Sequence, residues 1–202
     1  MFITFEGIEG AGKTTQITAL KDALTKQGKQ VVVTREPGGT AFGVTIREML
    51  LNPNTSFAHN DTELLLFFAD RYEHVATVVK PALAQNKVVI CDRFIDSTTA
   101  YQVGGRGRSQ QFCDALSAPV NLTPDITFLL DLPVEEGLGR AKKRAQLDRF
   151  EKEEVAFHQR IRDSFLAIAK QEPNRVFIVD ALQPQDTISK AIAASVQQWH
   201  NN

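Results

Sequence analysis

The sequence predicts an α/β fold in which helices cover both faces of a five-stranded parallel sheet. Five short apolar segments are typical of buried strands, amphipathic helical segments separate them, and a glycine-rich turn joins the first strand directly to the first helix. Strands that alternate with helices in this way are joined by right-handed crossovers and run parallel. The length of 202 residues, with 43% hydrophobic content and no internal linker, indicates one domain over residues 1–202.

The predicted strands have the nearly continuous apolar pattern of strands that are buried on both faces of a parallel sheet. In chain order they span residues 2–6, 30–34, 87–91, 126–131 and 175–180. The predicted helices have apolar residues at helical spacing. In chain order they span residues 13–27, 43–51, 61–79, 96–102, 109–118, 133–144, 151–170 and 184–199.

Helix boundaries come from residues that favour caps and turns. Gly28 fits the position after a helix C-terminus, and Asp61 and Ser109 are suited to cap the helices that follow them. Pro81 and Pro133 suit the first turn of a helix. The apolar residues expected to face the core are listed here in order: Ile17, Leu20, Leu24, Phe68, Tyr72, Val75, Val79, Phe157, Ile161, Phe165, Ile168, Ile188, Ile192, Val196 and Trp199.

Two segments are predicted to be irregular. Residues 104–108 combine three glycines with two arginines, which predicts a mobile basic loop. Residues 145–150 read as a short hinge between two helices. A second stripe on helix 61–79, made of Glu63, Phe67 and Arg71 at four-residue spacing, places a bare aromatic beside a cation and favours a binding face.

The turn after the first strand fits the pattern G-x-x-x-x-G-K-[ST], which defines a phosphate-binding loop, or P-loop. Glycines let backbone N–H groups turn inward and let phosphate oxygens approach closely, and the following helix N-terminus adds further donors. Lys13 is predicted to reach the β- and γ-phosphates, and the Thr14 hydroxyl to bind Mg²⁺. The residues expected to hold the nucleotide are Gly7, Ile8, Glu9, Gly10, Ala11, Gly12, Lys13, Thr14 and Thr15.

Polar residues follow the second and third strands as well. Glu36 and Pro37 come just after one, and Asp92 and Arg93 just after the other. Ligands of open α/β sheets bind at the carboxyl ends of the strands. These residues and the P-loop are therefore expected to meet in one site.

Several stretches resemble the thymidylate kinase family, and the resemblance covers nearly the whole chain. It implies a P-loop kinase fold that phosphorylates dTMP to dTDP with ATP and Mg²⁺, supplies dTTP for DNA synthesis and forms a homodimer. The matching stretches are residues 5–15, residues 34–40, Phe67 with Asp70 and Arg71, residues 92–94 with Tyr101 and Gln102, and residues 147–149 with Glu151.

The resemblance implies a role for each matching residue. Lys13 resembles the family's phosphate contact, and Thr14 and Asp92 its metal contacts. Arg93 resembles the arginine that lies between donor and acceptor phosphates. The residues expected at the acceptor nucleotide are Glu36, Pro37, Phe67 stacked on thymine, Arg71 beside the base, Arg93, Ser97, Thr98, Tyr101 against the 2′ position and Gln102 near the base.

The resemblance also implies a small helical lid over residues 137–151. Where one branch of the family has a basic residue inside the P-loop, this chain has Glu9, so it resembles the bacterial branch, whose lid supplies an arginine. Arg144 is the expected catalytic lid residue, with Arg140 and Lys143 in support. Phosphoryl transfer needs this extra positive charge.

Composition excludes several other classes. A net charge of −1 gives no general attraction to nucleic acid or anionic membranes, and apolar runs such as residues 64–69 are too short to span a bilayer. Cys91 and Cys113 give no disulfide framework, and the absence of a leader-like start favours a cytoplasmic protein. The histidines lack metal-ligand spacing and are expected to be structural or exposed: His59, His74, His158 and His200.

Two other functions stay open at this point. The chain could be a kinase for a different nucleoside monophosphate, because the base is decided by the surroundings of Phe67, Arg71 and Gln102. It could also be a P-loop GTPase switch, but that class reads guanine with N-K-x-D, and the segment Asn86-Lys87-Val88-Val89 lacks the aspartate.

Overall fold

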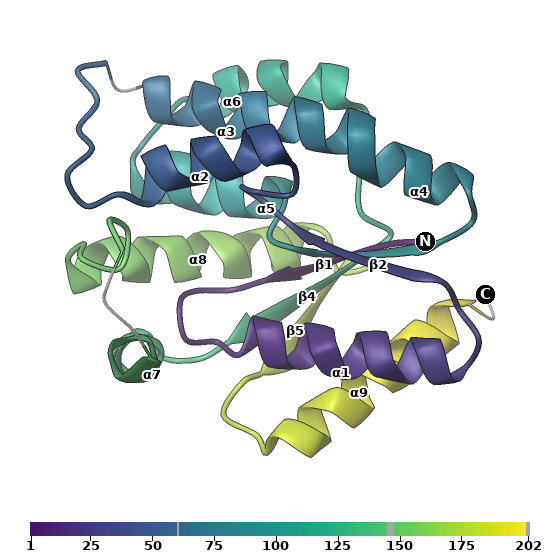
Figure 1. Cartoon of the computed structure of the whole chain (residues 1–202). Helices are drawn as coiled ribbons and strands as arrows, with labels where there is room; N and C mark the ends of the chain where they lie inside the picture. The colour runs from purple at the N-terminus through teal and green to yellow at the C-terminus, as the bar shows by residue number, and fades with distance from the viewer. Residues whose placement is uncertain (60, 145–147, 201–202) are drawn as a thin grey trace.

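The computed structural model describes residues 1–59, 61–144 and 148–200, without the side chains of Arg144 and His200. Its centre is a parallel sheet with the strand order β2-β3-β1-β4-β5, seen from the side in Figure 1. The predicted fold class is confirmed, and no strand boundary differs from its predicted position by more than one residue. The strands are β1 (Phe2–Glu6), β2 (Val31–Arg35), β3 (Val88–Asp92), β4 (Ile126–Asp131) and β5 (Val176–Asp180).

Helices cover both faces of the sheet. On one face, α1 (Lys13–Lys26) packs beside α9 (Gln185–His200), and the long helices α3 (Thr62–His74) and α8 (Val155–Gln171) lie on the opposite side (Figure 1). The remaining helical elements are α2 (Ala41–Leu51), η1 (Val75–Val79), α4 (Lys80–Ala84), α5 (Ile95–Thr98), η2 (Thr99–Gly105), α6 (Gln110–Ser117), η3 (Ala118–Val120) and α7 (Val134–Arg144).

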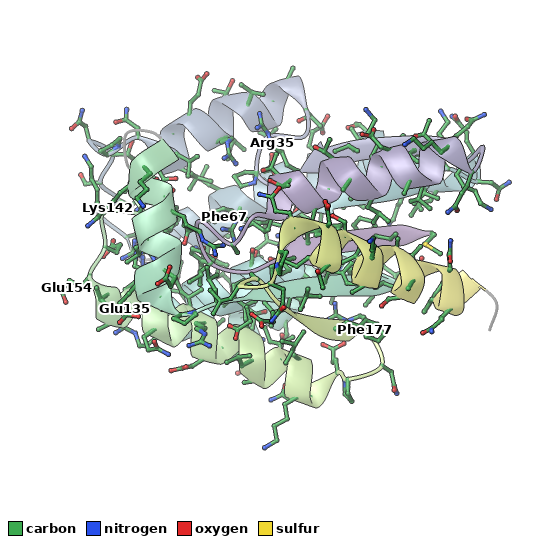
Figure 2. All side chains as sticks on the ribbon, turned by 90° about the horizontal axis from the view of Figure 1, so that it is seen from below. Arg35, Phe67, Glu135, Lys142, Glu154 and Phe177 are labelled. Carbon is green, nitrogen blue, oxygen red and sulfur yellow. The ribbon has the colours of Figure 1, made fainter. Side chains whose placement is uncertain are left out.

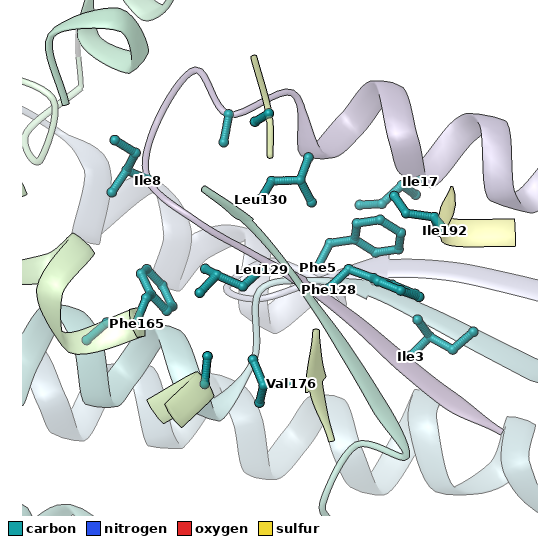
Figure 3. Packing of buried hydrophobic residues seen from close by; sticks show 14 of the residues in the cluster. Ile3, Phe5, Ile8, Ile17, Phe128, Leu129, Leu130, Phe165, Val176 and Ile192 are labelled. Carbon is teal, nitrogen blue, oxygen red and sulfur yellow. The ribbon is translucent and has the colours of Figure 1, made fainter. Parts of the chain in front are cut away.

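Successive side chains of the central strands enter opposite layers of the core, as the two-residue period of a strand requires. Phe128 and Leu130 lie on the side of α1 and α9, whereas Leu129 lies toward Phe165 of α8 (Figure 3). Both layers are buried, which explains why these strands are continuously apolar rather than alternating.

The strand register brings the ends of three strands to one level. Asp92 of β3 pairs with Phe5 of β1 on one side and with Arg35 of β2 on the other. The loops that leave these strands therefore start side by side, at the point where the chain switches from one half of the sheet to the other.

Two predicted segments differ from the structure. Helix α8 begins at Val155 rather than at residue 151, because Asp148 Oδ1 accepts hydrogen bonds from the backbone nitrogens of Phe150 and Glu151 and closes a turn there. The predicted loop at 104–108 is wrong in its first part, because Gly104 and Gly105 belong to the helical element η2.

Close packing explains the glycines of η2. A Cβ on Gly104 would lie 2.7 Å from Ser164 Cβ, and one on Gly105 would lie 2.7 Å from the Phe157 ring. These glycines therefore let η2 approach α8 rather than making the chain mobile.

Most of the predicted core residues are buried, with two exceptions. Tyr72 is 38% exposed and its hydroxyl donates to the Leu116 carbonyl, and Trp199 is 37% exposed near the end of α9. Cys91 and Cys113 are buried free thiols. Among the described residues, no helix combines the length and apolar character that a membrane span needs.

Candidate active site

A cavity of about 520 Å³ lies at the carboxyl ends of β1, β2 and β3. Its lining combines the P-loop with the loops after β2 and β3, and with side chains from α3, η2 and α7. Segments that are far apart in the sequence thus meet in one hollow, as the strand order requires. This is the place where the sequence analysis expected them to converge.

The P-loop takes a backbone path that needs glycine. Gly7 and Gly10 have φ angles of 132° and 73°, and a Cβ on Gly10 would lie 2.1 Å from the Gly137 carbonyl oxygen of α7. Lys13 is buried and donates hydrogen bonds at 3.0 Å to the carbonyl oxygens of Gly7 and Ile8. Burial, reinforced by the nearby Arg93, lowers the pKa of Lys13 to about 8.

Glu9 of the P-loop joins a cluster of polar side chains rather than facing solvent. It accepts from Arg93 Nη2 at 3.0 Å and from the Tyr101 hydroxyl, and His158 Nδ1 lies 3.6 Å from its second oxygen. Burial alone would raise the pKa of Glu9, but Arg93, His158 and Lys13 hold it well below its usual range. Glu9 is therefore an ionised anchor for the arginine.

Arg93 is held at a bend in the backbone. Its φ of 68° lies in the left-handed region that side chains rarely adopt, and its backbone nitrogen donates to the Phe5 carbonyl at 3.0 Å. Its guanidinium donates to Ser97 Oγ at 3.1 Å and lies 5.0 Å from the centre of the Tyr101 ring. A non-glycine residue kept in this conformation beside a cavity is typical of functional sites.

Glu6 is a buried site residue that the sequence analysis did not select. Its Oε1 accepts from the backbone nitrogens of Phe94 and Ser97, and its Oε2 accepts from the Ser97 hydroxyl. The carboxylate therefore fixes the turn that carries Arg93. The available signal was a charged residue at the end of an otherwise apolar strand.

The far end of the cavity has a buried guanidinium. Arg71 donates to Glu36 Oε2 at 2.7 Å and to Thr98 Oγ1 at 2.9 Å, and it lies between the rings of Phe68 and Phe94. The remaining nitrogen of the guanidinium, Nη1, is buried with no hydrogen-bond partner among the described residues. Arg71 therefore keeps one donor available.

Phe67 and Gln102 complete this end of the cavity. Phe67 is half-buried, and its ring meets Phe150 at a centroid distance of 6.2 Å. Gln102 is buried, and its side-chain nitrogen donates to Glu63 Oε1 at 3.0 Å. The end around Arg71 thus has a flat aromatic face and polar groups that suit a planar heterocycle.

Oxygen atoms suited to a cation lie at the P-loop end. Thr14 is exposed in the cavity, and Asp92 Oδ1 is buried without a hydrogen-bond partner within the described ranges. Mg²⁺ prefers a few protein oxygens and takes its other ligands from phosphates and water. These are the two residues that were predicted from the sequence to contact the metal.

Three comparisons with known proteins agree. The family model described as thymidylate kinase matches residues 5–192. The chain is 50% identical to a thymidylate kinase of Alcanivorax borkumensis over 98% of this chain and 96% of that protein. It is 51% identical to one of Pseudomonas putida over 96% and 95%. The chain belongs to the thymidylate kinase family.

A solved structure extends the agreement to three dimensions. The crystal structure of thymidylate kinase from Ehrlichia chaffeensis matches with a TM-score of 0.79 and 37% identity, covering 97% of this chain and 98% of that one. This likeness is consistent with the P-loop kinase fold expected from the sequence. As a member of the family, the chain is a nucleoside monophosphate kinase.

Most of the residues expected in a thymidylate kinase site line this cavity. Gly7 and Ile8 do not line it, because they form the buried start of the P-loop. The expected residues that do line it are Glu9, Gly10, Ala11, Gly12, Lys13, Thr14, Thr15, Glu36, Pro37, Phe67, Arg71, Asp92, Arg93, Ser97, Thr98, Tyr101 and Gln102.

The predicted lid, residues 137–151, is described in part. Arg140 lines the cavity, and its Nη1 donates to the Ala181 carbonyl at 3.1 Å. Lys142 and Lys143 are exposed, and Lys142 extends from the surface of α7 (Figure 2). The Arg144 side chain and residues 145–147 of the predicted hinge lie outside the described residues.

The cavity also includes residues that the sequence analysis did not select for the site. Arg35 directly precedes Glu36, so its position at the strand end was a usable signal. Arg47 of α2 donates to the Pro37 carbonyl at 3.0 Å, and no local pattern reveals that contact. The other unselected lining residues are Leu51, Phe94, Asp148, Phe150 and Glu151.

Proposed function

We propose that this cavity is where the enzyme phosphorylates dTMP to dTDP with ATP, the reaction that supplies dTTP for DNA synthesis. One observation carries the proposal. A single cavity joins a P-loop, which suits donor phosphates, to a face of Phe67, Arg71 and Gln102, which suits a planar base, with Arg93 between them. Donor and acceptor would thereby be held next to each other in one cavity.

A steady-state assay with ATP and five monophosphates tests the proposal: dTMP, dUMP, dCMP, dAMP and dGMP. We expect dTMP to give the highest kcat/KM. Equal or better turnover of dCMP or of a purine nucleotide would assign the cavity to another monophosphate.

The base fits the end of the cavity around Arg71. The Phe67 ring offers a stacking surface, and the free Nη1 of Arg71 is a donor for a base carbonyl such as O4 of thymine. Tyr101 fills the space toward the sugar, where its ring would crowd a 2′-hydroxyl. These contacts favour a deoxyribonucleotide with a carbonyl at position 4.

The donor phosphates fit the P-loop. Its backbone N–H groups and the N-terminus of α1 form an anion site, and Lys13 adds a positive charge. Lys13 now donates to the loop carbonyls of Gly7 and Ile8. Phosphate oxygens would replace these carbonyls as acceptors and would raise the charged fraction of the ammonium group.

Mg²⁺ fits the oxygen pair at the same end. The Thr14 hydroxyl and the Asp92 carboxylate would hold it, because Asp92 Oδ1 is buried without a partner in the described part of the chain. When bound, the ion would neutralise charge on the phosphates.

Arg93 lies between the two substrates. The transferred phosphoryl group carries charge on three oxygens in a loose transition state, so a fixed guanidinium stabilises it without reorganising. Glu9, Ser97 and the Tyr101 ring hold Arg93 in place before substrate binds. This preorganisation is the main contribution that we assign to the β3 loop.

The lid would supply further positive charge. We assign residues 137–151 to the lid and Arg144 to the catalytic role, with Arg140 and Lys143 in support. The helix α7 contacts the P-loop at Gly10, so a cation on α7 is near the phosphates. Lid closure would also exclude water from the reacting group.

We also propose that the chain acts as one domain and as a cytoplasmic homodimer. The support for a dimer is a set of exposed apolar residues on three neighbouring helices, α2, α3 and α6: Phe42, Val44, Met49, Leu65, Tyr72 and Phe112. Sedimentation equilibrium tests this proposal, and a monomer at micromolar concentration would contradict it.

A further inference from the structure

Glu63 of α3 is a buried carboxylate that does not line the cavity but contacts a residue that does. Its Oε1 accepts from Gln102 Nε2 at 3.0 Å, and its Oε2 accepts from Arg149 Nη2 at 2.5 Å. Arg106 Nε lies 3.6 Å from Oε1. Only 6% of Glu63 is exposed, so these contacts make up its polar surroundings.

The chemistry of the two groups fixes the orientation of the Gln102 amide. A carboxylate has only acceptors, whereas a carboxamide has a donor end and an acceptor end. The nitrogen of Gln102 must therefore face Glu63, and its carbonyl oxygen faces the other way. None of the described residues donates to that oxygen, and Gln102 lines the cavity.

We propose that Glu63 is a specificity-determining positioning residue, which makes Gln102 present an acceptor to the base. This rests on the proposed function, with dTMP in the cavity. Thymine and uracil have an N–H group at ring position 3, which suits an acceptor. Cytosine has an unprotonated nitrogen there, so it would meet the Gln102 carbonyl acceptor to acceptor, and a buried polar mismatch is strongly rejected.

Glu63 is itself held from the lid side of the cavity. The backbone nitrogen of Arg149 donates to the Leu51 carbonyl and its Nε to the Leu50 carbonyl, which keeps its Nη2 against Glu63. The carboxylate therefore cannot turn away from Gln102 without taking the acceptor from Arg149 Nη2.

The variant Glu63→Gln gives a sharp test. Arg149 needs an oxygen acceptor, so the amide nitrogen of the substituted side chain would face Gln102 and would turn the Gln102 amide over. The donor end of Gln102 would then face the base. We expect the ratio of kcat/KM for dTMP over dCMP to fall about tenfold or more, while the ratio for dTMP over dUMP stays within about twofold.

Glu153→Gln is the matched control. Glu153 pairs with the same Arg106, at 2.7 Å, but makes no contact with Gln102. The Glu153→Gln substitution removes a negative charge near the same arginine. The kcat/KM ratios for dTMP over dCMP and for dTMP over dUMP should therefore stay at their wild-type values. A loss of discrimination in this control would assign the effect to charge rather than to orientation.

The outcomes separate the inference from the proposed function. Wild-type enzyme that does not prefer dTMP over dCMP contradicts the proposed function. Wild-type enzyme that prefers dTMP, with an unchanged dTMP to dCMP ratio in Glu63→Gln, overturns the inference alone. A change in both ratios together would also overturn it, since that result indicates general damage to the site.

Two further measurements test the inference with a double variant and with the wild-type protein. In a Gln102→Ala background, Glu63→Gln should change the dTMP to dCMP ratio no further, because Glu63 acts through Gln102. In the wild-type protein, the Gln102 amide protons should exchange slowly with solvent in the free state and at a similar rate with dTMP bound. A rate that dTMP slows more than tenfold would show that these protons face the nucleotide, which overturns the inference.

Discussion

Ser97 Oγ donates a hydrogen bond of 2.5 Å to Glu6 Oε2, and the same serine oxygen accepts from Arg93 Nη1 at 3.1 Å. A carboxylate at the end of β1 thus acts through one hydroxyl group on Arg93, the arginine that we assign to the space between the two substrates. Glu6 also accepts from two backbone nitrogens of the β3 turn. The conformation of that turn therefore depends on a carboxylate that does not line the cavity.

The first prediction concerns the pH dependence of stability. Burial and the nearby Asp96 raise the pKa of Glu6 to about 7, against the lowering effect of Arg93 and the hydrogen bonds. The folded chain therefore binds a proton in a range, above about pH 4.5, where the unfolded chain has released it. The stabilising contribution of Glu6 is full below that range and is lost as the pH rises to about 7.

Glu6→Gln removes this titration but keeps the shape of the side chain. Urea unfolding of both proteins at several pH values should show the wild-type advantage shrinking as the pH rises toward neutral. Glu135→Gln, on the exposed surface of α7 (Figure 2), is the control and should show no such trend. A wild-type advantage that grows with pH would contradict the assignment.

The second prediction separates chemistry from stability at Lys13. Burial lowers its pKa to about 8, so the free enzyme bears a cost for keeping this group charged at neutral pH. Lys13→Met should abolish phosphoryl transfer and raise the thermal midpoint of unfolding. The dissociation constant of dTMP should stay within about threefold of the wild-type value, because the proposed base site lies at the far end of the cavity. Calorimetry and a coupled assay check all three, and measurable ATP turnover would refute the role.

The third prediction compares two phenylalanines. Phe67→Ala should weaken dTMP binding by about 1–3 kcal/mol, the scale of a base–aromatic stack. Phe177→Ala is the matched control, because Phe177 is also half-buried and tilted against another ring, that of Phe128, but lies apart from Phe67 (Figure 2). Equal dTMP affinity in the two variants would make Phe67 a packing residue only.

The sequence predicted the fold well because its signals are local. Continuous apolar strands such as residues 126–131 and the glycine-rich turn at Gly7 carry their structure in a few adjacent residues. The ends of helices were harder to predict where a side-chain hydrogen bond determines the boundary. Asp148 delays the start of α8 by closing a turn, and no periodicity shows that.

Candidate site residues could be predicted where they directly follow a strand. They were harder to predict where their contacts are with residues far away in the sequence. Lys13, Asp92 and Arg93 follow from the P-loop and the parallel sheet. Glu6 was not selected, and Glu63 was placed on a binding face without a specific role, because the partners of both carboxylates lie far along the chain. Gly104 shows the converse, since a loop-like sequence packs as a helix when another helix needs close approach.

The last prediction concerns the lid, which we expect to supply a catalytic cation from Arg144. The P-loop has Glu9 where a cation would serve the transition state, and Glu9 is already paired with Arg93. Arg140 and Arg144 lie four residues apart on α7 and share a face. Arg140 lines the cavity but donates to the Ala181 carbonyl, which restrains it.

Arg144→Ala should therefore lower kcat by roughly 10³-fold or more, the scale of an arginine that stabilises phosphoryl transfer, and leave dTMP affinity nearly intact. Arg144→Lys should recover only part of the loss, because an ammonium group lacks the planar fork of donors. Lys142→Ala, which changes an exposed residue of the same helix, is the control and should retain near-normal kcat. A loss below tenfold in Arg144→Ala would transfer the role to Arg140 or Lys143, and equally small losses in Arg144→Ala, Arg140→Ala and Lys143→Ala would end the lid hypothesis.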